Sequence, residues 1–364
     1  MPAHDITKLL DLPELRVVPG ERKASWGEEL DDHVIEFACD TGLLTTEAAR
    51  RFYRTQRIGT MCAYVIPGSV SRRRHRIYGE LMMWLFIYDD WAEQLGRYLP
   101  PHEVTAVTDT VHTWFADDEE DVRVPDLSLP RSLRLIWNEV RKDTSPAWRR
   151  RLRTELRGYL DTAAHEAGLV RTGRVTPFTE ARELRPLATA ARPVFTMAEH
   201  AYGIEMPAEV ARHPFLMQAG QSSAIGIALA NDIISVKADL LRGIRDNLVL
   251  ALQEEFGGDL QLNAARAAAR YHRAAAEFTA LRDRFHSPEG PPDPALSGRR
   301  DVAVHLQILD DWLYEGIKWQ LRETDRYSTT VRLTQEEHPN QLLGLAERLR
   351  ADRSGLRPVR SPSS

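Results

Sequence analysis

Three oxygen-bearing side chains in the second half of the chain have the spacing of a metal site on one helix. Asn231, Ser235 and Asp239 are four residues apart, so on an α-helix their side chains point from one face over two turns. An amide, a hydroxyl and a carboxylate suit Mg²⁺, which often shares its coordination shell with a substrate phosphate. Lys237 lies in the same two turns and could direct a positive charge toward that phosphate. The alternative is a solvated helix face, but residues 223–230 directly before are small and mostly apolar, which favours a buried site.

A second acidic cluster follows an apolar and aromatic run in the first third of the chain. Asp89 and Glu93 share a helix face at i and i+4, whereas Asp90 lies about 100° away. Like charges at this spacing repel each other unless a cation lies between them. Because residues 83–88 are too apolar for an exposed surface, we interpret these acids as the mouth of a cavity that holds metal. A solvated helix end is the alternative.

A third stretch begins with the same pair of acids. Asp310 and Asp311 precede Trp312, and Glu315 follows Asp311 by four residues. No comparable aromatic run lies upstream. We therefore assign these acids to the helix surface or to a supporting role behind the site.

Composition limits the kinds of partner. The chain has 364 residues, a formal net charge of −5, 43% hydrophobic and 28% charged residues, and a mean hydropathy of −0.40. This balance gives no electrostatic reason to expect a nucleic-acid or anionic-membrane partner. The two cysteines, Cys39 and Cys62, exclude a disulfide framework and a four-cysteine zinc site. We find neither a signal peptide nor an apolar run of membrane-spanning length, and we expect a cytoplasmic protein.

Helical periodicity covers most of the chain, and no alternating strand pattern is evident. We expect an all-α, single-domain bundle of ten or more helices around one central cavity. Residues 1–25 are predicted to be an irregular N-terminal arm, 26–330 the helical domain, and 331–364 a C-terminal extension with a disordered tail from Arg353. The acidic run 117–121 is predicted to be a solvated loop. The expected helices lie at 26–41, 46–66, 71–95, 101–116, 131–142, 146–168, 178–202, from 207, around 231, and at 247–256, 260–285 and 298–323.

Two predicted metal-binding helices in an all-α chain, acidic first and Asn-Asp-x-x-Ser-x-x-x-acid second, resemble the bacterial class I terpene cyclases. Residues 312–319 and 324–327 look like the family's tryptophan-bearing last helix and its Arg-Tyr pair. Residues 180–193 resemble the stretch that holds the family's diphosphate-sensing arginine, and Arg185 lies 46 residues before Asn231, the usual separation. The similarity spans about residues 26–330.

The resemblance implies a role for each matching residue. Several side chains would bind a total of three Mg²⁺ ions: Asp89, Glu93, Asn231, Ser235 and Asp239. Others would contact the substrate diphosphate: Arg185, Lys237, Arg326 and Tyr327. A helix break near Ala188 and Thr189 would place Thr189 where it promotes ionisation, and Asp90 would pair with an arginine on closure. The indole of Trp312 is the aromatic face that we expect to stabilise a carbocation.

The chain departs from the family pattern at three positions. The third ligand of the second motif is Asp239, whereas the family more often has Glu. Ala238 stands where the family usually has a basic residue, with Lys237 one position earlier. Pro186 follows Arg185 and could shift the helix break.

The resemblance implies a Mg²⁺-dependent lyase that ionises and cyclises an acyclic prenyl diphosphate. We expect farnesyl diphosphate as substrate and a sesquiterpene as product, with a diterpene cyclase acting on geranylgeranyl diphosphate as the first alternative. A chain-elongating prenyltransferase is disfavoured, because its second metal motif should also be rich in Asp. A catalytically silent helical binding protein is the remaining alternative. We expect a monomer or a homodimer with a small-molecule substrate, and neither nucleic acid nor membrane as partner.

Overall fold

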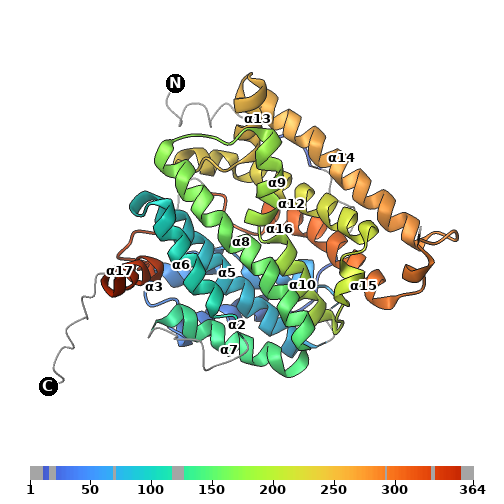
Figure 1. Ribbon diagram of the computed structural model, residues 1–364, viewed down its shortest axis with the longest axis horizontal. Coiled ribbons are helices and arrows are strands. Elements are labelled where there is room, and N and C mark those ends of the chain that lie inside the picture. Colours follow the sequence, from blue (N-terminus) through green and yellow to red (C-terminus); the bar gives the residue numbers. More distant parts are fainter. Residues whose placement is uncertain are drawn as a thin grey trace.

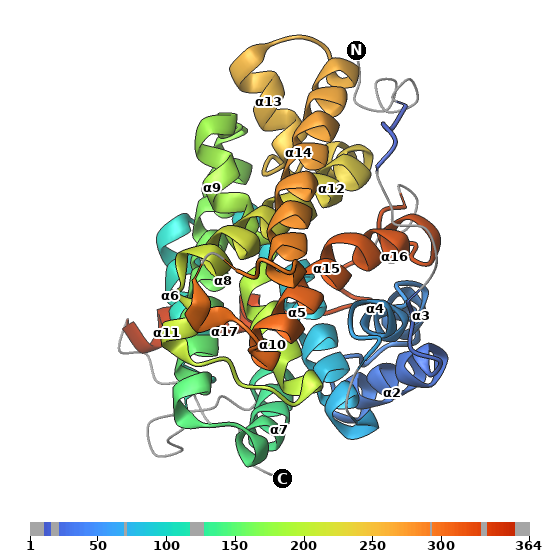
Figure 2. The same ribbon diagram turned by 90° about the vertical axis from the view of Figure 1, so that its right-hand side faces the viewer.

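The computed structural model describes residues 11–15, 22–68, 71–116, 127–291, 293–328 and 333–353, and within these ranges every regular element is helical (Figures 1 and 2). This confirms the all-α fold. The elements in chain order are α2 (Gly27–Asp40), α3 (Glu47–Thr55), α4 (Ile58–Val65), α5 (Arg72–Tyr98), α6 (Pro101–Thr113), α7 (Ser128–Asp143), α8 (Pro146–Thr172), α9 (Phe178–Ala188), α10 (Ala191–Tyr202), α11 (Ala208–Ala211), α12 (Pro214–Arg242), α13 (Leu248–Phe256), α14 (Leu260–His286), the 3₁₀ turn η1 (Pro294–Leu296), α15 (Arg300–Asp310), the π-helical turn η2 (Asp311–Glu315), α16 (Gly316–Arg322) and α17 (Gln341–Arg353).

Capping residues explain where several helices begin and end. The side chains of Thr46, Ser71 and Asn247 accept hydrogen bonds from the first turns of α3, α5 and α13. Gly243 ends α12 in the left-handed conformation, which glycine adopts without steric cost. The long helices α5 and α12, which carry the two predicted metal motifs, therefore have well-defined ends.

The stretch that we expected to form one helix over 46–66 is divided into α3 and α4. Arg57 has a left-handed backbone (φ 54°) and turns the chain between them. The new direction brings α4 against α2 so closely that a Cβ atom at Gly59 would lie 2.1 Å from the backbone nitrogen of Asp31. The break thus allows a helix crossing that helical periodicity does not predict.

The stretch expected as one helix over 178–202 is also divided. Ala190 adopts φ 54° between α9 and α10, and Pro193 lies in the first turn of α10, where its missing N–H has no helical partner to lose. The resemblance had placed a break near Ala188 and Thr189, and the structure has it at this point. Pro186 lies inside α9 and does not end it.

The last core helix is continuous but widens into the π-helical turn η2 between α15 and α16. The acids of this turn are buried: Asp310, Asp311 and Glu315 are 3%, 0% and 1% exposed. Arg22 contacts all three, and Lys318 pairs with Glu315. Our assignment of these acids to the helix surface is wrong, because resident cations neutralise them inside the protein.

The C-terminal extension contributes α17, which packs against α6 and α5 at the edge of the bundle (Figure 1). Leu342, Leu345 and Ala346 of this helix are buried. The tail was expected to begin at Arg353, but this residue is the last of α17. The rest of the expected tail, 354–364, lies outside the described residues, as do the acidic run 117–121 and residues 1–10.

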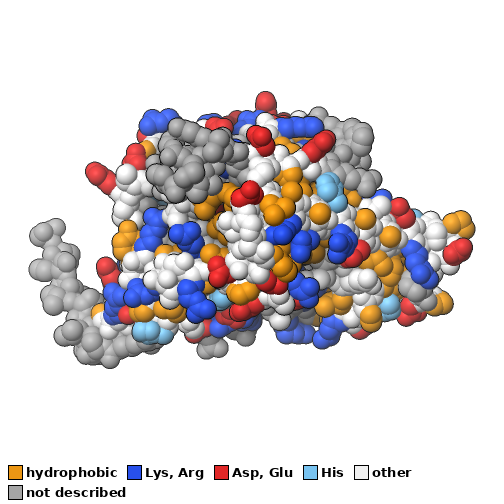
Figure 3. Space-filling model, turned by 90° about the horizontal axis from the view of Figure 1, so that it is seen from above, with side chains coloured by type: hydrophobic (Ala, Val, Ile, Leu, Met, Phe, Trp, Pro, Cys, Tyr) orange, Lys and Arg blue, Asp and Glu red, His pale blue; other side chains and the backbone are white. Residues whose placement is uncertain are grey.

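The surface carries charges of both signs. Lys and Arg side chains are interspersed with Asp and Glu over the face shown in Figure 3 rather than gathered into one basic region. Of the helices in the described ranges, none is both long enough and apolar enough to cross a bilayer.

Candidate active site

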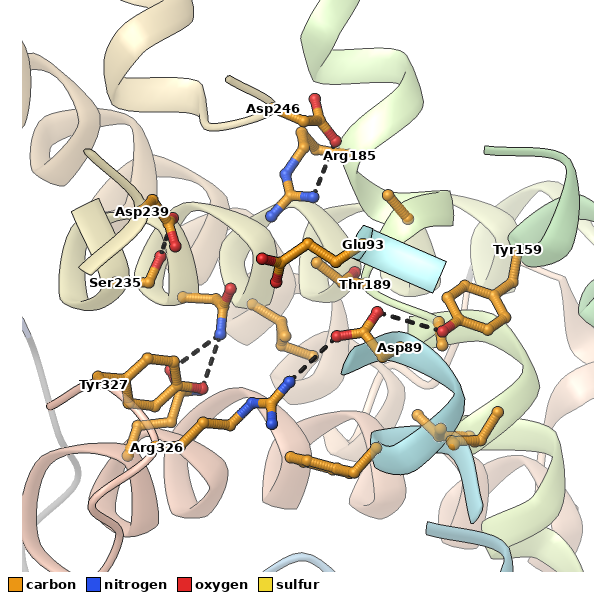
Figure 4. A pocket seen from close by; sticks show the side chains of 18 of the residues that line it. Asp89, Glu93, Tyr159, Arg185, Thr189, Ser235, Asp239, Asp246, Arg326 and Tyr327 are labelled. Atoms are coloured by element: carbon orange, nitrogen blue, oxygen red, sulfur yellow. Dashed lines mark hydrogen bonds and ion pairs between the residues drawn. The ribbon is translucent and has the colours of Figure 1, made fainter. Parts of the chain in front are cut away.

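A cavity of about 210 Å³ lies between α5 and α12, and both predicted metal motifs border it (Figure 4). Asp89 and Glu93 reach it from α5, and Asn231, Ser235 and Asp239 reach it from α12. Much of the remaining wall is apolar, formed by Met61, Met82, Leu85, Phe86, Val194, Ile227, Trp312 and Trp319. The two motifs, 142 residues apart in sequence when measured from Asp89 to Asn231, thus share one hollow with a polar rim and an apolar wall.

The acidic motif on α5 is fixed by its neighbours. Asp89 accepts a hydrogen bond from the Tyr159 hydroxyl (3.2 Å) and pairs with Arg326 Nη2 (3.1 Å). Asp90 pairs with the same guanidinium (3.0 Å) and accepts a hydrogen bond from Tyr53 (2.7 Å). The expected pairing of Asp90 with an arginine is therefore present. The two adjacent carboxylates share the guanidinium of Arg326.

The polar side chains on α12 also have defined partners. Asn231 donates through Nδ2 to the Tyr327 hydroxyl (2.8 Å), which leaves its amide oxygen for another ligand. Ser235 donates to Asp239 Oδ2 (2.6 Å), and Asn247 donates to the same oxygen (2.9 Å). The helix spacing i, i+4 and i+8 places the three groups in a column, as the sequence indicates.

These side chains fit a hard divalent cation. Burial raises the pKa of Asp89 and Asp239, and it raises the pKa of Glu93 to about 7. A cation between the helices would favour the charged carboxylates again. Within the described ranges no three His, Cys, Asp or Glu side chains converge on one point. Asn231 and Ser235 offer neutral oxygens to the same cavity.

Arg185 reaches the cavity from the last turn of α9, opposite the acidic motif. Its guanidinium makes hydrogen bonds to both oxygens of Asp232 (3.1 and 2.5 Å) and to Asp246 (2.9 Å). Three of about five guanidinium N–H donors are used in this way, so donors remain for a ligand in the cavity. Asp232 is completely buried, and the backbone N–H of Leu248 also donates to it (2.7 Å). The arginine is thus held in position before any substrate binds.

The break between α9 and α10 borders the same cavity. Ala188, Thr189 and Ala190 all line it, and the Thr189 hydroxyl donates to the Pro186 carbonyl (3.3 Å). The chain therefore presents irregular backbone to the substrate region directly beside Arg185.

Arg326 and Tyr327 cover the cavity from the segment after α16. Besides its two acids, Arg326 lies over the ring of Phe86 (4.6 Å to the centroid) and donates to Gln56 (3.0 Å). Trp312, in the π-helical turn, lines the cavity and packs edge-on against Phe195. The structure therefore brings these predicted residues to one site.

Lys237 is the predicted site residue that the structure does not bring to the cavity. It is two residues from both Ser235 and Asp239, about 200° around the helix, so it points away from them. Arg242, in the last turn of α12, lines the cavity instead and donates to the Arg326 carbonyl (3.1 Å). The sequence could have indicated this role, because Arg242 is three residues after Asp239, and residues i and i+3 share a helix face.

Three further ionisable lining residues were not identified from the sequence: Tyr159, Glu166 and Asp246. Burial, together with the charge of Asp246, raises the pKa of Glu166 well above its usual range. Tyr159 and Glu166 lie on α8 within an amphipathic pattern of charged and apolar residues, so neither stands out in the sequence. Only the packing of α8 beside α5 identifies them.

Comparison with known proteins agrees with this geometry. Residues 80–277 match the family described as Terpene synthase family 2, C-terminal metal binding. Pristinol synthase of Streptomyces pristinaespiralis is 27% identical over 307 residues, which cover 83% of this chain and 81% of the relative. Sesquiterpene synthase 3 of Postia placenta is 26% identical over 327 residues, which cover 89% and 82%.

Solved structures show the same fold at low sequence identity. Cucumene synthase superimposes with a TM-score of 0.70 at 22% identity, covering 86% of this chain and 99% of that one. Hedycaryol synthase in complex with nerolidol gives a TM-score of 0.70 at 20% identity, covering 85% and 100%. Because the family match spans more than half of the chain, the protein belongs to terpene synthase family 2 and is a class I terpene synthase, a carbon–oxygen lyase acting on phosphates.

Proposed function

We propose that the protein is a Mg²⁺-dependent sesquiterpene cyclase that ionises farnesyl diphosphate, cyclises the carbon chain and releases diphosphate. The observation that carries the proposal is one cavity that combines an apolar wall with oxygen-bearing side chains from α5 and α12 and with arginines. A prenyl diphosphate has a charged head, which would match the polar side chains, and a hydrocarbon tail, which would match the apolar wall.

The name of one relative supports the shorter of the two candidate substrates. Sesquiterpene synthase 3 of Postia placenta aligns with 89% of this chain.

The rim residues would bind the leaving group. In our proposal Asp89 and Glu93 hold Mg²⁺ on one side, and Asn231, Ser235 and Asp239 hold it on the other, with three ions in total as the family resemblance implies. When bound, Mg²⁺ supplies positive charge that stabilises the departing diphosphate.

Three further side chains would act on the diphosphate directly. Arg185 and Arg326 donate planar, charged hydrogen bonds suited to phosphate oxygens, and the Tyr327 hydroxyl adds a neutral donor. Because all three are held in position by other side chains, they need little rearrangement as charge develops on the leaving group.

The apolar wall would protect the carbocation that remains. The rings of Phe86 and Trp312 line the cavity and can attract a cation through their faces. Water would quench such a cation, so the cover formed by Arg326 and Tyr327 has to exclude it during the reaction. In our proposal Thr189 and its neighbours in the helix break, which line the cavity, promote ionisation of the substrate.

The test is incubation of the purified protein with geranyl, farnesyl and geranylgeranyl diphosphate separately, with Mg²⁺ or with a chelator, followed by identification of volatile hydrocarbons. We expect a cyclic fifteen-carbon product from farnesyl diphosphate that disappears with the chelator. Added isopentenyl diphosphate should produce no longer chain, which a prenyltransferase would make.

Two outcomes would overturn the proposal. A twenty-carbon product formed in preference would identify a diterpene cyclase. Thermal stabilisation by Mg²⁺ with inorganic diphosphate, without product from any of the three substrates, would identify a silent binding protein.

A further inference from the structure

The segment 333–353, which follows the Arg326–Tyr327 cover, packs behind the acidic motif of α5. Asn340 donates through Nδ2 to the carbonyl of Trp91 (2.9 Å), and the His338 ring lies 5.0 Å from the Trp91 ring. The Thr46 hydroxyl donates to the carbonyl of Glu337. His338 and Asn340 are 5% and 4% exposed. The C-terminal segment is thus in direct contact with the residue that follows Asp89 and Asp90.

Tyr53 connects this segment to the acidic motif. Its hydroxyl is buried, donates to Asp90 Oδ2 (2.7 Å) and lies 3.4 Å from His338 Nε2. Burial lowers the pKa of His338 to about 4, so its ring is neutral at neutral pH and its Nε2–H can donate to Tyr53. Arg326 contacts both oxygens of Asp90, because Nη1 donates to Oδ2 (3.3 Å) and Nη2 lies 3.0 Å from Oδ1. A continuous chain of hydrogen bonds therefore runs from His338 through Tyr53 and Asp90 to Arg326.

This chain distinguishes two adjacent acids. Asp89 lines the cavity and Asp90 does not, although both contact the Arg326 guanidinium. The 100° step of the helix separates the Cα–Cβ directions of the two residues. The Asp90 side chain is nevertheless flexible enough for its carboxylate to turn toward a metal bound at Asp89. The Tyr53 hydroxyl donates to Oδ2 of Asp90. If Asp90 turned toward the metal, it would lose this charge-assisted hydrogen bond, and this loss opposes the movement.

We propose that Tyr53, supported by His338 of the C-terminal segment, is a positioning residue that keeps Asp90 on Arg326 and away from the metal, so that Asp89 alone of the pair serves the cavity. The inference rests on the proposed function, because it takes Asp89 as a metal ligand. It also makes residues 333–353, which lie beyond the matched family region 80–277, part of the active-site support.

The test compares Tyr53→Phe with Tyr64→Phe as a matched control. Tyr64 is also a buried tyrosine outside the cavity wall, but its hydroxyl donates to the carboxylate of Glu323 (2.9 Å) rather than to that of Asp90. For each variant the rate of hydrocarbon formation is measured against Mg²⁺ concentration, and the melting temperature is measured with and without Mg²⁺ and inorganic diphosphate.

We expect Tyr53→Phe to raise the Mg²⁺ concentration needed for half-maximal rate about tenfold, which corresponds to about 1.4 kcal/mol. It should also reduce the stabilisation by Mg²⁺ with inorganic diphosphate, while Tyr64→Phe changes neither. In an Asp90→Asn background the Tyr53→Phe change should have little further effect on the Mg²⁺ requirement, because Tyr53 acts through Asp90.

A second variant covers the case in which Tyr53→Phe does not fold. His338→Ala removes the support of Tyr53 and should shift the Mg²⁺ requirement in the same direction. His338→Gln keeps a hydrogen-bond donor, so its Mg²⁺ requirement should lie closer to that of the wild type.

If the wild-type enzyme is active and Tyr53→Phe matches Tyr64→Phe in its Mg²⁺ requirement, the inference is overturned and the proposed function stands. If the wild type forms no hydrocarbon, the proposed function fails, and equal stabilisation of Tyr53→Phe and wild type by Mg²⁺ with diphosphate overturns the inference separately.

Discussion

Replacement of Arg185 by Met separates the structural role of this arginine from its proposed catalytic role. The side chain is 12% exposed and neutralises Asp232, which is 0% exposed, together with Asp246. Removing one partner of a buried ion pair costs about 3–5 kcal/mol, because the remaining charge stays buried without a partner. We expect Arg185→Met to lose stability in this range and to lose at least about 10²-fold in turnover, the effect of removing one preorganised donor from a developing charge.

The double variant Arg185→Met/Asp232→Asn should recover most of the stability and none of the turnover. Asparagine keeps the shape of Asp232 and an oxygen for the N–H of Leu248, but it carries no charge. Asp232→Asn alone, in which Arg185 still pairs with Asp246, should keep turnover within about tenfold of wild type, corresponding to about 1.4 kcal/mol. The measurements are urea unfolding and product formation under saturating Mg²⁺ for all four proteins.

The pH dependence provides an internal check on this reasoning. Burial raises the pKa of Asp232 to about 6, and Arg185 opposes the rise. A carboxyl whose folded pKa exceeds its unfolded value contributes less stability as pH rises through that interval, because the native state has to give up a tightly bound proton. The loss in Arg185→Met should therefore be larger at pH 8 than at pH 5. Recovery of turnover along with stability in the double variant would refute a catalytic role for Arg185.

Three further predictions concern the rim and the N-terminal arm. Asn231→Leu should abolish hydrocarbon formation while circular dichroism shows an intact helical fold, and unimpaired output would contradict its role as a ligand. Arg242→Gln should raise the KM for the prenyl diphosphate about tenfold, while Lys237→Gln leaves it unchanged, because only Arg242 lines the cavity; equal KM values in steady-state kinetics would contradict this. Arg22→Met should destabilise the protein by about 1–2 kcal/mol at pH 8 and less at pH 5, because it removes a partly exposed cation from Asp311, whose pKa burial raises to about 7. Urea unfolding at the two pH values measures this difference, and an equal loss at both would argue against the pairing.

Local patterns predicted the polar column on α12, because helix periodicity alone sets the spacing of Asn231, Ser235 and Asp239. The existence of most helices followed in the same way from caps and apolar spacing. The breaks at Arg57 and Ala190 could not be predicted by periodicity, because each is a left-handed residue that is stabilised by how the following helix packs.

The residues missed in the site are those whose role depends on long-range packing. Glu166 lines the cavity because α8 packs along α5, and a single glutamate on a charged helix carries no local indication of this. The assignment of Lys237 to the site fails for a local reason. Lys237 is close in sequence to Ser235 and Asp239, but its side chain leaves the opposite face of the helix. Arg242, three residues after Asp239, shares the face that lines the cavity.

The two Asp-Asp-Trp stretches show what decides function when the sequence pattern is the same. Asp310 and Asp311 share Arg22, Asp310 also pairs with Arg282, and Glu315 pairs with buried Lys318, so three acids face three cations from the fold. Beside the cavity, Asp89 and Asp90 share the one guanidinium of Arg326.

Among the described residues, Glu93 makes no ion pair, and burial raises its pKa to about 7. Negative charge beside the cavity therefore exceeds what neighbouring side chains neutralise, and protons or an external cation can balance it. In our proposal the cations of the fold satisfy the first cluster, whereas the second takes up Mg²⁺. We therefore propose that charge balance across the fold, rather than the acidic motif itself, distinguishes the structural cluster from the metal site.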